Sequence, residues 1–205
     1  MNGFFKHIKY LFLFFFIAFI VYLPTFNNGF VWDDVEFIVN NTGVHHWNIV
    51  DLFGFNLYNT PSFYRPVHAL YNTSLYSIFG QQATFNHFIQ LILHVLNTYL
   101  LFLLLCMFFS KCLSVMLSLL FLIHPINVES VAYINTMNGI LPSLFVLTVF
   151  LLSTTKRVGV GRMACVTGLM LCGILTKEAA VLVLRLACTR TPASKWPKVS
   201  GMRSS

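Results

Sequence analysis

The sequence predicts an all-α polytopic membrane protein, and three features of its composition lead to that fold class. Only 13 of its 205 residues are Lys or Arg and only 6 are Asp or Glu. The charged fraction is therefore 9%, whereas soluble proteins average about 25%. Hydrophobic residues make up 57% of the chain and its mean hydropathy is +0.75, which is more apolar surface than a compact soluble domain of this size can bury. The aromatic fraction of 16% excludes a disordered chain, which would be poor in aromatic residues.

The apolar runs predict a bundle of about five or six transmembrane helices. Lys6 and Lys9 precede the first run and no small-residue cleavage site follows it, which indicates an uncleaved signal anchor. The third run ends at His124, because the residue before a proline is driven out of the helical region. Several runs are shorter than the roughly 20 residues of a perpendicular span, so they either extend into flanking polar residues or lie in a partly re-entrant region. The five clearest runs lie at 10–23, 87–109, 112–123, 139–153 and 163–176.

A long polar segment at 24–86 separates the first two runs and is predicted to be the first extracytoplasmic loop. Within it, apolar residues recur at helical spacing and predict an amphipathic helix over 67–79. That helix is too polar to cross a bilayer, and its apolar face suits the membrane interface. The sequence therefore predicts a loop with its own membrane-associated structure.

The basic residues predict that the N-terminus is cytoplasmic. With that orientation the outer loops hold a single cation, Arg65, whereas the inner segments hold six, as the positive-inside rule requires. We therefore attribute the net charge of +7 to cytoplasmic loops and not to a nucleic-acid partner. The same orientation places every acid except Glu178 on the outer face, where we expect the chemistry. The six inner cations are Lys6, Lys9, Lys111, Lys156, Arg157 and Arg162.

The end of the sequence departs from this charge pattern. A sixth apolar run at 179–184 is interrupted at Arg185, and a basic tail without acids follows at 188–205. By the span count this tail would lie outside, against the charge rule. Either the sixth helix is cut short in a truncated chain, which we favour, or the span count is off by one. The predicted organisation is a partial transmembrane domain at 1–187 and a basic tail at 188–205.

Paired acids directly after the first run are the clearest candidates for catalysis. Asp33 and Asp34 are adjacent, so their charges repel each other and at least one pKa should rise unless a cation compensates. A carboxylate of that kind suits a general base. The alternative is a solvated acidic turn. Nothing in the sequence defines a metal site, so a divalent metal stays unsupported.

Further polar residues of the outer face and the spans are candidates for substrate binding or for shaping the site. Arg65 offers a fork of donors that matches a phosphate or a carboxylate, and its alternative role is a headgroup anchor. His87 and His94 are seven residues apart and so share one helix face, where hydrogen bonding within the bundle is the plainer interpretation. The remaining candidates are His124 and Glu129 around a helix break, and Lys177 with Glu178, which could form a local ion pair.

In combination, these motifs resemble the amino-terminal half of the GT-C superfamily of polyprenyl-phosphate-sugar glycosyltransferases. The resemblance covers about 28–183 and is greatest to the tetratricopeptide-repeat-containing transmembrane O-mannosyltransferase family and its bacterial relatives. Members of that family have about a dozen spans and often carry tetratricopeptide repeats, whereas this sequence has five or six spans and no 34-residue repeat. The motifs are Gly29-Phe30-Val31-Trp32-Asp33-Asp34, Tyr64-Arg65-Pro66, Phe85-Asn86-His87 with His94, His124-Pro125-Ile126 with Glu129, and Leu175-Thr176-Lys177-Glu178.

The resemblance implies a GT-C-like bundle and a role for each candidate residue. Asp33 falls on the family's catalytic base and Asp34 on its supporting acid. The implied donor is a dolichyl or undecaprenyl phosphate sugar, whose leaving phosphate needs positive charge or hydrogen bonds. We infer that Arg65, His124 and Lys177 supply them. His87, His94, Glu129 and Glu178 are then expected to shape the site.

The sequence thus predicts a glycosyltransferase, or a fragment of one, that moves a sugar such as mannose to a protein hydroxyl or another acceptor at the extracytoplasmic face. The expected partners are membrane lipid, the lipid-linked sugar and a protein acceptor. The Trp-Asp-Asp form favours a bacterial plasma membrane over the endoplasmic reticulum. A non-catalytic membrane subunit or truncated isoform is the alternative, and a small transporter ranks last because only Lys177 and Glu178 are candidates for mid-span charges.

Overall fold

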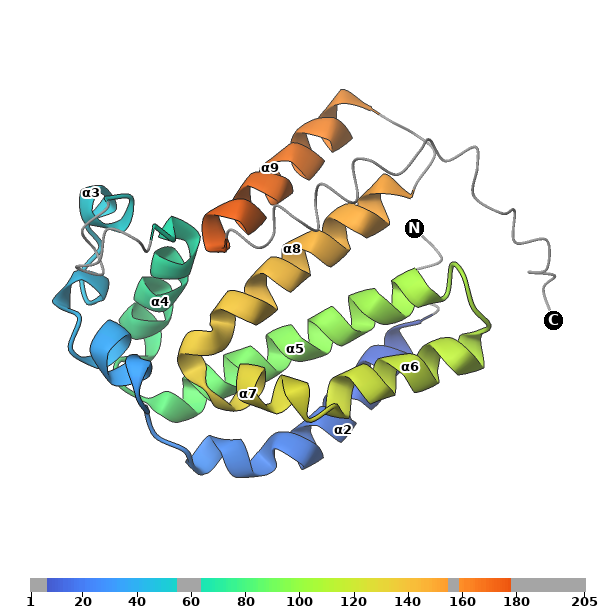
Figure 1. Ribbon diagram of the computed structural model, residues 1–205, viewed down its shortest axis with the longest axis horizontal. Coiled ribbons are helices and arrows are strands. Elements are labelled where there is room, and N and C mark those ends of the chain that lie inside the picture. The colour runs from blue at the N-terminus through green and yellow to red at the C-terminus, as the bar shows by residue number, and fades with distance from the viewer. Residues whose placement is uncertain (1–6, 55–63, 155–158, 178–205) are drawn as a thin grey trace.

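The computed structural model describes residues 7–54, 64–154 and 159–177, and in these segments the chain is helical with no strand (Figure 1). The predicted sixth run, the basic tail and Glu178 lie outside the described residues. In chain order the elements are α2 (Ile8–Tyr22), η1 (Leu23–Asn27), η2 (Val35–Val39), η3 (Thr42–Val44), α3 (Ile49–Leu52), α4 (Pro66–Phe79), α5 (Ala83–Leu105), α6 (Lys111–Ile123), α7 (Ile126–Ala132), η4 (Ile134–Thr136), α8 (Met137–Ser153) and α9 (Val160–Thr176).

The described segments form a helical membrane protein. Three helical stretches are long and apolar enough to cross a bilayer: Ile8–Asn27, Ala83–Leu105 and Ile134–Ser153. A fourth span results if α6 and α7 are counted together, although a bend of 60° separates them. The helix α9 is apolar but shorter, so it is a fifth apolar element of the kind that the sequence predicts. A helix is present at the predicted position 67–79 as α4, but its buried residues include His68, Asn72 and Thr73, whereas Ile78 of the predicted apolar face is 70% exposed.

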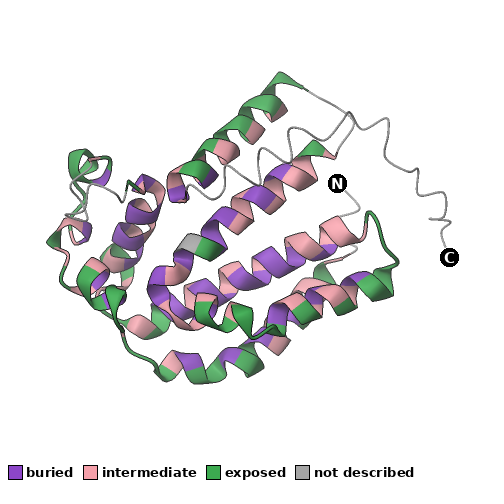
Figure 2. Ribbon diagram, viewed as in Figure 1, coloured by how far each residue is buried: buried purple, intermediate pink, exposed green. Residues whose placement is uncertain are grey.

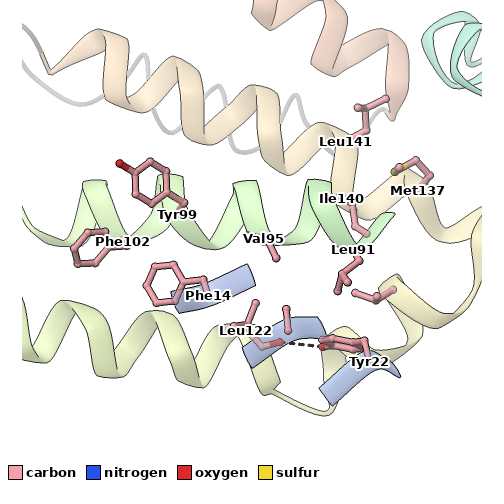
Figure 3. Packing of buried hydrophobic residues seen from close by; sticks show 12 residues of the cluster. Phe14, Tyr22, Leu91, Val95, Tyr99, Phe102, Leu122, Met137, Ile140 and Leu141 are labelled. Carbon is pink, nitrogen blue, oxygen red and sulfur yellow. Dashed lines mark hydrogen bonds between the residues drawn. The ribbon is translucent and has the colours of Figure 1, made fainter. Parts of the chain in front are cut away.

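The helix α5 lies at the centre of the bundle. Figure 3 shows its side chains packed against α2 and α6 on one side and α8 on the other. Figure 2 shows buried residues along α5 and exposed residues along the outer faces of α2 and α6. On α2, Phe14 is fully buried whereas Phe12 and Phe16 are 67% and 65% exposed. An aromatic surface of this kind is what a lipid-facing helix presents.

The break between α6 and α7 is stabilised by side chains from neighbouring helices. Pro125 ends α6 because it has no N–H to donate and disfavours a helical residue before it. The carbonyl of Leu122, near the end of α6, accepts a hydrogen bond from the Tyr22 hydroxyl at 2.9 Å. Nε2 of His94 lies 3.0 Å from the same oxygen. These contacts satisfy a buried carbonyl that a continuous helix would have satisfied.

The two ends of the bundle carry different charges. At the basic end, α2 begins, α5 turns into α6, and α8 leads to α9 (Figure 1). The acid end is where α2 ends, α5 begins and α7 joins α8. The loop that carries η2, η3 and α3 also lies at this end. The basic end holds Lys9, Lys111 and Arg162 among the described residues, and the acid end holds Asp33, Asp34, Glu36, Asp51 and Glu129, with Arg65 and Lys177.

Candidate functional site

The acid pair lies where the first loop meets the start of α8. Asp34 precedes the π-helical turn η2 and is completely buried. Its Oδ1 accepts a hydrogen bond from the backbone N–H of Asn135 at 2.7 Å. Its Oδ2 accepts one from the N–H of Val31 at 3.2 Å. The Asp34 side chain therefore ties the first loop to a turn 101 residues further along the chain.

Burial raises the pKa of the Asp34 carboxyl, because the charged form loses its hydration. Backbone N–H groups of Val31, Asn135 and Ile134 lower that pKa in part, and the neighbouring charge of Asp33 raises it. The predicted rise in the pKa of one acid therefore falls on Asp34, and desolvation contributes more to it than repulsion within the pair. With both oxygens bonded to backbone donors, Asp34 is suited to anchoring the loop.

Asp33 is exposed to solvent and directly precedes the buried Asp34. Burial raises the pKa of the Tyr133 phenol, and the charges of Asp33 and Asp34 raise it further. Trp32 packs edge-on against the Tyr133 ring, with 5.8 Å between centroids. Its indole is 82% exposed and its φ is +47°, a conformation that non-glycine residues rarely adopt.

Polar side chains on the first half of α5 hold the turn that carries Tyr133. Nε2 of Gln90 donates to the carbonyl of Tyr133 at 3.2 Å and to that of Ile134 at 2.6 Å. His87, one turn earlier, is completely buried, and neither of its ring nitrogens has a hydrogen-bond partner among the described residues. The helix α5 therefore supports the turn at Tyr133 and Ile134, whereas the site-shaping role of His87 stays a prediction.

The other predicted histidine of α5 serves the fold. A spacing of seven places His94 on the same buried face as His87. Its Nε2 lies 3.0 Å from the Leu122 carbonyl at the end of α6, and its ring packs edge-on against Tyr22 at 5.8 Å. These contacts agree with hydrogen bonding within the bundle, the plainer interpretation of the pair.

The predicted donor-phosphate residues Arg65 and Lys177 border the contact between α4 and α9. Arg65 precedes the first residue of α4, and Lys177 follows the last residue of α9. The C-terminal end of α9 lies beside α4 in Figure 1, and the two helices are in contact. His68, one turn into α4, is buried, and desolvation followed by the charge of Arg65 lowers its pKa to about 4. His68 is therefore neutral at physiological pH.

His124 and Glu129 lie in a third place, at either side of the start of α7. Both are exposed. Nδ1 of His124 accepts from the N–H of Ile126 at 3.2 Å, a local contact within the bend. The α7 helix separates His124 from Tyr133 by roughly 10 Å along its axis, at about 1.5 Å a residue. Within the described segments, Asp33 and Asp34 therefore lie together, whereas Arg65, Lys177, His124 and Glu129 lie at separate places around them.

Several residues of the site could not be selected from the sequence. Tyr133 and Asn135 belong to a polar segment between two apolar runs, and Gln90 is one of several polar residues in α5. Their signal is polarity next to a predicted helix break, which marks backbone that needs hydrogen-bond partners. The position of His68 in the sequence is not next to a predicted helix break, so nothing there marked it as a residue of the site. Within the segments that the structure describes, no group of three or more His, Cys, Asp or Glu side chains could hold a metal ion.

Comparison with known proteins points to the family whose motifs the sequence resembles. The chain is 30% identical to the human protein O-mannosyl-transferase TMTC3 over 175 residues, and 29% identical to the mouse protein of that name over 174. The aligned region covers 78% of this chain and 19% of each relative, so the chain spans about a fifth of their length. No family model and no solved structure matches. The similarity supports a relationship to these O-mannosyl-transferases and nothing narrower. Both relatives are mammalian, so the bacterial membrane stays a prediction.

Proposed function

We propose that the protein is a glycosyltransferase, or part of one, that transfers a sugar such as mannose from a polyprenyl-phosphate donor to a protein hydroxyl at the extracytoplasmic face of the membrane. The similarity to O-mannosyl-transferases over 78% of the chain supports this reaction class. The observation that carries the proposal is the acid pair, in which one carboxylate is buried and bonded to the backbone while its neighbour faces solvent.

The two acids have different roles in this proposal. A general base needs an oxygen that an acceptor hydroxyl can reach within hydrogen-bond distance. Both oxygens of Asp34 accept backbone hydrogen bonds, and the side chain has no exposed surface. Asp33 is exposed and is held beside the bundle by the anchor at Asp34. Asp33 is therefore the base, and Asp34 fixes the loop from which it acts.

The transfer is a single displacement at the anomeric carbon of the donor sugar. The acceptor oxygen forms a bond to that carbon as its proton passes to a carboxylate oxygen of Asp33. The bond between the anomeric carbon and the phosphate oxygen breaks, and the lipid phosphate leaves with the electron pair. Because the acceptor attacks opposite the leaving phosphate, the anomeric centre is inverted.

The leaving lipid phosphate needs positive charge aimed at it. Arg65 and Lys177 are the cations of the acid end among the described residues, and both border the contact between α4 and α9. A guanidinium can hold two phosphate oxygens at once. We assign the donor phosphate to this pair in preference to His124, which lies at the α6–α7 bend. The dolichyl or undecaprenyl chain then extends into the bilayer.

The proposal is tested by Asp33→Asn with Glu36→Gln as the matched control. Glu36 is an exposed acid three residues further along the same loop. Membranes from cells expressing each variant are assayed for transfer of labelled mannose from dolichyl-phosphate and undecaprenyl-phosphate mannose to protein. Asp33→Asn should reduce transfer about 100-fold or more, and Glu36→Gln should retain it. Transfer that survives in Asp33→Asn contradicts the proposal. The proposal is also contradicted if membranes with the wild-type protein transfer no more mannose than membranes without it. That result would favour a non-catalytic membrane subunit.

A further inference from the structure

Trp32 is a large aromatic side chain that the fold leaves uncovered. Its indole is 82% exposed, and it directly precedes Asp33, whose side chain is exposed as well. Because the Cα atoms of consecutive residues are only about 3.8 Å apart, both side chains lie within reach of one sugar ring. Trp32 is therefore placed to contact a substrate on which the proposed base acts.

The backbone of Trp32 is strained. Its φ of +47° is the one positive value at a non-glycine residue in the segments that the structure describes. Glycine adopts such values without a steric cost, whereas a bulky side chain does not. Strained conformations of this kind are concentrated at binding and catalytic sites, where the surrounding structure holds them in place. The strain therefore points to a role for the indole itself.

Hydrogen bonds on both sides hold Trp32 in this conformation. The Trp32 carbonyl accepts from the N–H of Val35 at 3.0 Å. The preceding residue, Val31, bonds to Asp34 twice: its N–H donates to Oδ2 at 3.2 Å, and its carbonyl accepts from the Asp34 N–H at 2.9 Å. Asp34 in turn accepts from the N–H of Asn135, so Trp32 belongs to the anchored part of the loop.

The indole also has a fixed partner. Its ring packs edge-on against Tyr133, with 5.8 Å between centroids and an interplanar angle of 80°. The Tyr133 backbone is held by the buried Gln90, whose Nε2 donates to its carbonyl at 3.2 Å. Edge-to-face pairs fix the relative orientation of two rings. Since the indole is 82% exposed, this contact leaves most of its surface open to a ligand.

We propose that Trp32 is a sugar-binding residue, whose indole face stacks on the sugar ring of the lipid-linked donor beside Asp33. This inference rests on the proposed function, since it names the contact for the sugar of that reaction. One face of a pyranose such as mannose presents C–H groups with partial positive charge, and the face of an aromatic ring is negative. That face also suits the positive charge that develops at the anomeric carbon as the bond to phosphate breaks.

An exposed indole can instead anchor a protein in the membrane interface. That role needs only exposure, and Trp47, further along the same loop, is 57% exposed without a positive φ. The strained backbone and the Tyr133 contact distinguish Trp32 from such an anchor, because they hold its ring in one orientation. Trp47 is therefore the matched control.

The first test uses the fluorescence of one indole at a time. The tryptophans of the sequence are Trp32, Trp47 and Trp196, so replacing two of them by Phe leaves one reporter in the membrane-embedded chain. Dolichyl-phosphate mannose and undecaprenyl-phosphate mannose are titrated against the same lipid phosphates without sugar. At least one mannosylated lipid should shift the Trp32 emission saturably to shorter wavelength, and the bare phosphates should not. An equal shift with the bare phosphates, an equal shift of Trp47, or no shift of Trp32 overturns the inference.

An activity measurement separates the inference from the function on which it rests. Trp32→Gly removes the ring and suits the positive φ, so its Tm should stay close to that of the wild type while the KM for the mannosyl donor rises about 5–10-fold. Trp32→Phe keeps an aromatic face and should recover most of the affinity, and Trp47→Gly should leave the KM unchanged. If Asp33→Asn retains transfer, the proposed function fails whatever Trp32 binds. If Asp33→Asn abolishes transfer while Trp32→Gly keeps the wild-type KM, only the sugar contact fails.

Discussion

The two halves of α5 hold the bundle together by different means. Toward the basic end, Tyr99 and Phe102 pack among aromatic rings, and the ring of Phe102 lies 5.7 Å from that of Phe14 (Figure 3). From Asn97 toward the acid end, polar side chains instead bind backbone carbonyls of other segments, as Gln90, His94 and Asn97 do. Aromatic packing suits regular helices, which satisfy their own backbone, whereas broken helices need side-chain donors.

This difference explains why the candidate site lies at the acid end. Backbone that leaves helical geometry inside a membrane protein must be satisfied by its neighbours, and the polar half of α5 provides the donors. The freed segments can then carry a buried side chain such as Asp34 in a fixed position. The basic end has regular helix termini and, among the described residues, no comparable constellation.

The largest expected effect concerns the membrane side of each end. Cys112, exposed at the start of α6, marks the basic end, and Val50→Cys, at a position 79% exposed in α3, marks the acid end. With the predicted cytoplasmic N-terminus, an impermeant maleimide should label single-cysteine variants with Cys112 only from the cytoplasmic side and with Val50→Cys only from the opposite side. Labelling of both from one side would contradict the assignment of the two ends to opposite faces.

A smaller effect is expected from the polar half of α5. Gln90→Leu removes the donors to the Tyr133 and Ile134 carbonyls and should lower the free energy of unfolding by about 2 kcal/mol. Thr98→Val is the matched control, since Thr98 is also completely buried but bonds only to the His94 carbonyl of its own helix. Thr98→Val should lower the free energy of unfolding by about 0.5 kcal/mol or less. Denaturant unfolding in detergent measures the free energy of unfolding of both variants. An equal decrease in the two would show that the long-range hydrogen bonds of Gln90 stabilise the fold no more than a bond within one helix.

The smallest expected effect is a pH dependence of stability from Asp34. Its pKa is raised in the folded protein, so the native state binds this proton more tightly than the unfolded state does. The stabilising effect of the proton is therefore present at low pH and is lost as the pH rises through the native pKa. The Tm of the wild type relative to Asp34→Asn should rise as the pH falls from 7 toward 4. A constant or falling difference would mean that burial does not raise the pKa of this carboxyl.

Much of the fold was predictable, because the spacing of hydrophobic residues indicates where the helices lie. The run at 112–123 ends at the helix end that Pro125 imposes, and the helix expected at 67–79 is α4, which starts one residue earlier. The span at 87–109 is displaced, because α5 begins at Ala83 and ends at Leu105. Polar residues in its first turns face the protein interior, so apolar composition alone placed its start too late.

The candidate site was less predictable, since it depends on contacts between distant segments. The acid pair was found from its charges, but the sequence does not say which acid is buried. That difference arises from the bond between Asp34 and Asn135, which are about 100 residues apart. Tyr133 was missed for the same reason, because its contacts with Gln90 and Trp32 follow from no motif of its own.

The central claim is that the adjacent acids divide two tasks, chemistry for Asp33 and anchoring for Asp34. The most direct test measures mannose transfer and Tm together for Asp33→Asn and Asp34→Ala. Asp33→Asn should lose transfer about 100-fold and keep a Tm close to that of the wild type. Asp34→Ala leaves the buried N–H groups of Val31 and Asn135 without their acceptor and should lose about 3 kcal/mol of stability. A Tm loss of equal size in both variants, or transfer retained in Asp33→Asn, would contradict the division.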